Sequence, residues 1–143
     1  MKKYLATLII LVISSVTISD QTWSDPYSSA SVKSQSQQKA SITFKNKSDY
    51  TMTLKVMKLY GGLYTTVTLS PRSSRTVTFS NTSSYKLKIK AVHNGRPSYH
   101  DGGKFSVTCN EYEWTEGTME FMLSTYGNGL GPTISAKEFE SNN

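Results

Sequence analysis

Two histidines and the single cysteine of this chain stand close together and are the residues best suited to chemistry. His93, His100 and Cys109 fall within seventeen residues. Imidazole nitrogens and a thiolate could together hold a metal ion, and a cysteine beside a histidine could act as a nucleophile with its base. Whether the three side chains meet depends on the strands that carry them.

Two turn signals in this segment define a first possible arrangement. Asn94-Gly95 and Asp101-Gly102 are both typical of two-residue hairpin turns. If both turns form, His93 pairs near the start of a short strand and His100 lies at its end, roughly 13 Å away along the strand. Ligands of one metal ion must all lie about 2 Å from it, so this separation is too large for a shared site.

A second arrangement uses one long hairpin instead. If residues 85–92 pair directly with 104–110, residues 93–103 form a loop and Cys109 lies roughly 20 Å from His93. Neither arrangement gathers all three side chains, so we expect no metal site, no cofactor and no nucleophile with its base. The parity of Cys109 matches that of the apolar residues before it, which predicts a small core residue.

Acidic and aromatic residues alternate directly after this segment. Glu111 and Glu113 would lie about 6.6 Å apart on one face of a strand, a spacing found between paired glycosidase carboxylates. Such pairs face each other across a cleft rather than along one strand, so a hydrolase is the least favoured function. Tyr112 and Trp114 share the other face, where exposed rings could bind sugars or partner side chains. The alternative for Trp114 is a place in the core.

A row of lysines forms a second candidate surface. Lys86, Lys88 and Lys90 alternate with apolar residues, which places their ammonium groups on the wet face of one strand at intervals of about 6.6 Å. They could bind an anionic ligand, or they could keep a sheet edge from pairing with other chains. Tyr99, with the two histidines of the 93–103 loop, could extend a contact surface. No nucleic-acid-binding motif is present, so nucleic acid is not an expected partner.

The elements that must position these residues are short strands. Apolar residues recur at every second position in repeated short runs, which is typical of strands with one buried face. The parity switches near Met57, which predicts a bulge in that strand. Turn residues separate the runs, at positions 46–49, 61–62, 70–74, 80–84, 94–95 and 101–102. The pattern predicts an all-β domain at 41–126, a single immunoglobulin-like β-sandwich of about seven short antiparallel strands, with a small barrel as the alternative.

The N-terminal residues are typical of an export signal. Lys2 and Lys3 precede an apolar run that ends at Ile18, and this run is shorter than the about 20 residues that span a bilayer. We therefore expect a signal peptide at 1–19 and a secreted, periplasmic or cell-surface protein without a transmembrane span after cleavage; a retained anchor is the alternative. Cleavage would lower the formal charge from +6 to +4.

The segments that flank the domain are poor in large apolar residues. Residues 20–40 are rich in Ser and Gln and predict a flexible spacer, and 127–143 predict a flexible C-terminal tail in which Ser135 and Glu138 could cap a short helix. Asn46-Lys47-Ser48 and Asn81-Thr82-Ser83 match the N-glycosylation pattern, which matters only in a eukaryotic source.

These features favour a binding module over an enzyme. We expect an exported, non-catalytic β-sandwich that binds a carbohydrate or a cell-surface protein, with no catalytic residues. The candidate ligand-binding residues are Tyr112, Trp114, Tyr99, His93, His100, Lys86, Lys88 and Lys90. The alternative is a structural or assembly subunit that pairs through an exposed sheet edge. The sequence does not define an oligomeric state.

Overall fold

The fold is known from a computed structural model of the chain. It describes the backbone of 5–6, 11–17, 39–127 and 130–143, and the side chains of 39–123 and 130–143. The expected spacer at 20–40 lies outside the described residues except at its last two positions, and so does most of the expected signal peptide.

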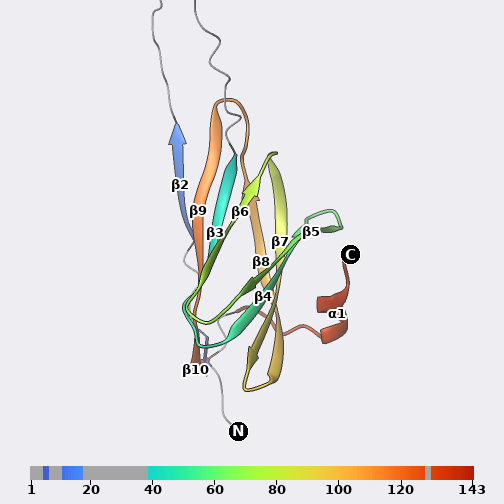
Figure 1. The fold of residues 1–143 in the computed structure, drawn as a ribbon. Helices are drawn as coiled ribbons and strands as arrows, with labels where there is room; N and C mark the ends of the chain where they lie inside the picture. The colour runs from blue at the N-terminus through green and yellow to red at the C-terminus, as the bar shows by residue number, and fades with distance from the viewer. Residues whose placement is uncertain (1–4, 7–10, 18–38, 128–129) are drawn as a thin grey trace, which may run out of the picture.

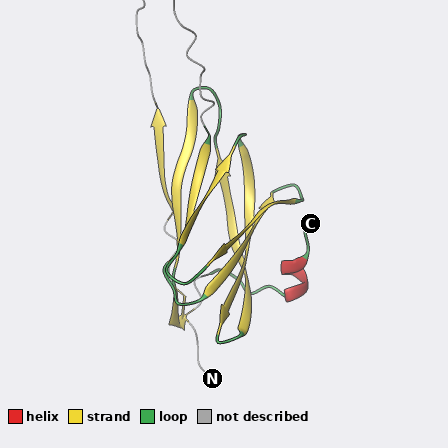
Figure 2. Cartoon of the chain, in the orientation of Figure 1, coloured by secondary structure: helices red, strands yellow, loops and turns green. Residues whose placement is uncertain are grey.

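Strands make up most of the described chain, with one short helix near its end (Figures 1 and 2). Seven strands follow one another through the expected domain, as the alternation predicted. They are β3 (Ala40–Asn46), β4 (Thr51–Lys58), β5 (Leu63–Leu69), β6 (Ser74–Phe79), β7 (Ser83–His93), β8 (Arg96–Val107) and β9 (Glu113–Phe121). Outside them lie β1 (Leu5–Ala6), β2 (Leu11–Thr17), β10 (Leu123–Gly127) and α1 (Ala136–Glu140).

The strands form two layers that face each other (Figure 1). One sheet has the order β2-β9-β3-β6 and the other has the order β5-β4-β7-β8, while β1 and β10 pair separately. The predicted all-β class and the seven strands in two sheets are therefore confirmed. The expectation that all strands are antiparallel is wrong at one place, because β3 and β9 pair in parallel.

The strand order also differs from that of an immunoglobulin domain. There the first, second, fourth and fifth strands share a sheet. Here the first, fourth and seventh of the seven strands, β3, β6 and β9, share one sheet, and β4, β5, β7 and β8 form the other. The resemblance is thus limited to size and to two packed layers, because alternation predicts which face of a strand is buried and carries no information on its neighbours.

The core lies between the layers and is rich in aromatic rings. The alternating residues Ala40, Ile42 and Phe44 of β3 are buried, as are Leu87 and Ile89 of β7. Rings from both sheets meet there at centroid distances between 4.9 and 6.3 Å, among them Phe44, Tyr64, Phe79, Tyr85, Phe105 and Phe121. Edge and offset contacts of this kind add stability beyond the burial of apolar area.

The hairpin that carries the histidines contains one of the two predicted turns. Asn94 and Gly95 have φ of 50° and 73° and connect β7 directly to β8, as a two-residue turn of this type requires. Asp101-Gly102 does not form a turn. Instead β8 continues to Val107, and its register against β7 shifts between Lys86 and Lys88. A Cβ at Gly102 would lie 2.8 Å from side-chain atoms of Leu87 and Ile89, so a residue without a side chain is needed at this bulge.

The bulge predicted from the parity switch in β4 is also present. Its register against β5 shifts between Val56 and Met57, which pairs with Leu63. Met57 and Lys55 lie on the face of β4 that points away from the core, yet both are buried. Something must cover this face, and the C-terminal segment does so.

The C-terminal residues pack onto the sandwich instead of forming the expected tail. Leu130 and Phe139 are buried, and the amides of Asp101 and Ile134 donate hydrogen bonds to the carbonyls of Pro132 and Tyr99. The segment thereby runs along the edge of β8, and α1 lies outside the β5-β4-β7-β8 sheet (Figure 1). Its predicted cap is confirmed, because the Ser135 hydroxyl accepts a hydrogen bond from the Glu138 amide at 3.1 Å.

Candidate functional site

The predicted ligand-binding residues occupy four separate places. Tyr112 and Trp114 lie at the β8–β9 hairpin, and Lys86, Lys88, Lys90 and Tyr99 lie on the outer face of the β5-β4-β7-β8 sheet. His93 lies at the end of the sandwich opposite the β8–β9 hairpin, while His100 pairs with Ile89 in the middle of β8. They do not form one site.

The β8–β9 hairpin, residues 108–114, holds Tyr112 in an exposed position. The Asn110 side-chain oxygen accepts hydrogen bonds from the amides of Tyr112 and Glu113, at 2.9 and 2.8 Å. At the base of the hairpin the Thr115 amide donates to the Thr108 carbonyl, and the Thr108 amide donates to the Thr115 hydroxyl. Tyr112 is 80% exposed on this well-bonded turn. A ring presented in this way binds with little loss of conformational entropy.

Trp114 takes an intermediate position between the two alternatives that the sequence left open. It is half-buried and packs against the edge of the core, while its indole nitrogen donates a hydrogen bond to the Glu116 carboxylate at 3.2 Å. Cys109 pairs with it across the hairpin. Cys109 also packs against the core but is not fully buried, so its predicted core position is correct only in part. Glu111 and Glu113 are both exposed.

A second tyrosine projects from a hairpin at the same end of the sandwich. Tyr60 is 99% exposed at the turn between β4 and β5. The strand registers place this turn beyond Lys58 and Tyr85, at the end where β7 begins and β8 stops. The end that carries Tyr112 therefore has two hairpins with an outward aromatic ring.

The lysine row lies on a partly covered face, whereas the alternation alone predicts a wet one: Lys88 is buried, and Lys86 and Lys90 are half-buried. The Lys88 ammonium donates hydrogen bonds of 2.6 and 2.7 Å to the carbonyls of Glu138 and Ser141. Lys55 of the neighbouring strand bonds the Glu140 carbonyl at 3.1 Å and lies over the Phe139 ring. The last carbonyls of a helix have no partners within it, so these cations satisfy the C-terminal end of α1.

The lysines are consequently occupied in binding the chain itself. Burial lowers the pKa of Lys88, and the charge of Lys86 lowers it further. Lys86 bonds the Asn143 carbonyl at 3.3 Å, and Lys90 lies over the Tyr99 ring, whose other neighbour is Phe139 at 5.4 Å. The strand parity was predicted correctly, and the covering segment was missed. Lys86, Lys88, Lys90 and Tyr99 therefore have a structural role and are not part of the candidate site.

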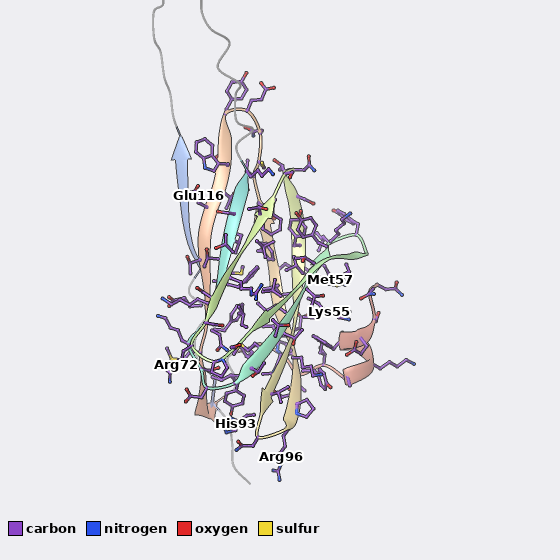
Figure 3. All side chains as sticks on the ribbon, in the orientation of Figure 1. Lys55, Met57, Arg72, His93, Arg96 and Glu116 are labelled. Atoms are coloured by element: carbon purple, nitrogen blue, oxygen red, sulfur yellow. The ribbon has the colours of Figure 1, made fainter. Side chains whose placement is uncertain are left out.

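The two histidines are separated, as strand geometry predicted. His93 pairs with Arg96, four residues from the position of His100 on β8, and its exposed ring stacks on Tyr50 at 4.5 Å. Figure 3 shows His93 and Arg72 toward the same end of the sandwich. Among the described residues, no three His, Cys, Asp or Glu side chains are grouped closely enough to hold a metal ion.

His100 is not a surface residue, contrary to its assignment as a ligand-binding candidate. It is 6% exposed, because the C-terminal segment crosses it, and its ring nitrogens contact the Gly131 carbonyl and the Ser98 hydroxyl at 3.3 and 3.1 Å. Burial lowers the pKa of His100, and the hydrogen bond to the Gly131 carbonyl partly offsets this.

We expect His100 to make the folded state less stable as the pH falls below about 6.5, the pKa of an ordinary histidine. In this range the unfolded chain takes up a proton that the folded chain resists, so the free energy of unfolding decreases by at most about 1.4 kcal/mol per pH unit. Urea unfolding between pH 5 and 8 should therefore give a steeper profile for the wild type than for His100→Gln.

The comparison with His100→Gln is needed because a second group acts in the same direction. A hydrogen bond from Lys47 lowers the pKa of Glu120 from its ordinary value of 4.5, so that stabilising contact is lost in acid as the pH approaches and falls below 4.5, near the lower end of this range. Both proteins contain Glu120, and its contribution cancels in the difference. If the free energy of unfolding changes equally with pH in the wild type and in His100→Gln, His100 has no such effect.

A hollow of about 460 Å³ lies at the end of the sandwich opposite Tyr112 and was missed by the sequence analysis. Loops from distant parts of the chain form it, namely those after β3, β5 and β9. Its lining combines cationic, polar and apolar side chains: Lys45, Asn46, Lys47, Ser48, Asp49, Arg72, Met122 and Leu123. The cations are largely paired, since Lys45 and Lys47 contact Glu120 and Arg72 bonds Asp49 at 3.0 Å.

The shape of the hollow depends on Asn46. Its side chain is 1% exposed; the amide nitrogen donates to the carbonyls of Tyr50 and Ser70, and the oxygen accepts from the amide and hydroxyl of Ser48. The bond to the Ser70 carbonyl ties the β3–β4 loop to the β5–β6 loop, and the other three bonds hold the β3–β4 loop itself. They also occupy the nitrogen that N-glycosylation would need, whereas Asn81 of the other matching tripeptide is exposed. The turns at 46–49 and 70–74 were predicted from the sequence, but the contact between them was not.

No helix in the described part of the chain is long and apolar enough to cross a membrane. Comparisons of the chain with protein-family models, with curated proteins and with solved structures found no match.

Proposed function

We propose that this chain is an exported, non-catalytic β-sandwich module that binds a carbohydrate or a cell-surface protein through the β8–β9 hairpin. The observation that carries the proposal is the 80% exposure of Tyr112 on a turn held by the side chain of Asn110. A large apolar ring exposed to water on a rigid turn is suited to stack on a sugar ring or to enter a partner's pocket.

Neighbouring residues provide the polar contacts that such a site needs. Glu111 and Glu113 flank Tyr112, and Glu116 holds the indole of Trp114 at the base of the hairpin. Carboxylates can accept hydrogen bonds from sugar hydroxyls or pair with cations of a protein partner. Export is supported by the lysine pair and the short apolar run at 1–19.

Replacing Tyr112 by alanine (Tyr112→Ala) should weaken ligand binding at least about tenfold, the loss typical of an exposed aromatic anchor. The ring makes few contacts within the chain, so the free energy of unfolding should change by less than about 0.5 kcal/mol. Binding of the exported protein to surface polysaccharides and to whole cells measures the first quantity, and urea unfolding measures the second.

Tyr60→Ala is the matched control, because it removes an equally exposed ring from a different hairpin. It should leave binding unchanged. Trp114 fluorescence reports directly on the hairpin, and Trp114→Phe identifies its signal. A ligand that binds the wild type and Tyr112→Ala equally well would contradict the assignment of the site to this hairpin.

A further inference from the structure

The outer edge of β9 is the place in the sandwich where a strand is added from the N-terminal part of the chain. β2 lies antiparallel to β9 over seven residue pairs, from Leu11 opposite Met119 to Thr17 opposite Glu113 (Figure 1). β2 falls within 1–19, the residues assigned to the export signal. Its removal would leave the amides and carbonyls of this β9 edge without backbone partners.

The other edges of the sandwich are covered or shaped differently. The edge of β8 is bonded by the C-terminal segment through Asp101 and Ile134. β5 and β6 follow one another around a corner of the sandwich, where the Tyr64 hydroxyl donates to the Thr78 carbonyl at 2.8 Å. The edge of β9 has neither proline nor lysine, two residues that commonly prevent strand pairing.

We propose that, after residues 1–19 are removed, the outer edge of β9 binds an extended strand of another protein chain, which takes the place of β2. The inference rests on the export part of the proposed function and is independent of Tyr112. Backbone hydrogen bonds along β9 would provide affinity, and side chains at alternate positions would provide specificity.

The position of β2 defines the chemistry of the partner strand. Leu11, Ile13 and Ser15 pair with Met119, Gly117 and Thr115, of which Met119 and Thr115 are buried core-side residues. The partner should therefore run antiparallel to β9 and place apolar residues opposite Met119 and Gly117, as Leu11 and Ile13 of β2 do. Gly117 has no side chain, which leaves room for a branched residue opposite it. The intervening positions, which face Glu116 and Thr118, should be polar.

The test uses the exported, processed protein and a synthetic peptide of residues 11–17 with lysines added at both ends for solubility. We expect saturable binding, and slower hydrogen exchange of the β9 amides when the peptide is bound. A peptide with Ile13→Asp, which places a charge opposite Gly117, should bind at least about tenfold more weakly. The full chain with its N-terminus intact is the matched control and should not bind, because β2 already covers the edge.

Each outcome separates this inference from the proposal on which it rests. An exported protein whose mass still includes residues 1–19 would overturn the export signal itself. A processed protein that binds neither peptide, or binds both equally, would overturn strand addition at β9 while leaving export intact. A processed protein that forms a stable dimer through β9 and excludes the peptide would overturn it in favour of pairing between two copies of this chain.

Discussion

Replacing Gly131 by alanine (Gly131→Ala) is expected to detach the C-terminal segment from the sheet and to lower the free energy of unfolding by about 3 kcal/mol. Gly131 has a φ of 89°, a conformation that disfavours every residue with a Cβ atom. A Cβ at this position would also overlap the carbonyl oxygen of Asp101, a backbone atom that cannot rotate away. The chain can accommodate alanine only by moving the segment.

That movement would break a defined set of contacts. The Gly131 carbonyl contacts His100, and the next residues bond the backbone of β8 at Tyr99 and Asp101. Hydrogen exchange measures the loss directly, because the amides of Asp101 and Ile134 donate to these partners. Both should exchange faster in Gly131→Ala, while amides of the core strands keep their protection relative to global unfolding.

Gly103→Ala is the control for backbone strain alone. Gly103 has a similar φ of 81°, but a Cβ there would have no atom within 4 Å. We expect it to cost about 1 kcal/mol, the strain of a left-handed conformation. If the two variants lose equal stability and Asp101 stays protected in both, the overlap at Gly131 does not hold the C-terminal segment in place.

The C-terminal segment also illustrates what the sequence could not predict. Leu130 and Phe139 are isolated apolar residues in a polar stretch, so no periodic pattern indicates that they are buried. Leu130 belongs to the core cluster, Phe139 packs against Tyr99 of β8, and Lys55 and Lys88 satisfy the end of α1. The alternation correctly placed these lysines opposite the core. It could not tell a solvated face from one covered by residues fifty positions away.

Sequence patterns correctly predicted the features that depend only on residues close together in the chain. The strands, the Asn94-Gly95 turn and the β4 bulge follow from spacing within a few residues. Asp101-Gly102 has the same composition as a hairpin turn but lies inside a long strand pair, where the glycine is needed for close packing against Leu87 and Ile89. Strand order and the hollow depend on contacts between distant segments, and no pattern within either segment encodes them.

The candidate binding residues show the same difference between local features and contacts of distant segments. The alternation of aromatic with acidic residues is a local property, and it predicts Tyr112 and Trp114 on one face of a strand. In the structure β9 begins only at Glu113, so that Tyr112 lies in the turn before it. His100 was assigned to the surface because it was expected in a loop or at a turn. In the structure it lies within β8, beneath the segment that contains Gly131.

Replacing Asn46 by alanine (Asn46→Ala) is expected to lower the free energy of unfolding by about 3 kcal/mol and to loosen both loops of the hollow. The change removes four hydrogen bonds, two of which the Asn46 amide donates to the carbonyls of Tyr50 and Ser70. Each buried polar group that loses its partner costs about 1–3 kcal/mol. Urea unfolding measures the total, and hydrogen exchange of the Ser48 amide measures the local effect.

Two further variants separate the donor from the acceptor role of Asn46. Ser73→Ala removes only an exposed bond to the same Ser70 carbonyl, so its cost should stay below about 1 kcal/mol. Asn46→Asp keeps an oxygen for Ser48 but places a carboxylate against two carbonyls 2.6 and 3.0 Å away. It should destabilise the protein at least as much as alanine does, because the second carboxylate oxygen is buried against two carbonyls and the two donated bonds are lost. Stability close to that of the wild type in Asn46→Asp would contradict the inference that the two donated bonds hold the loops together.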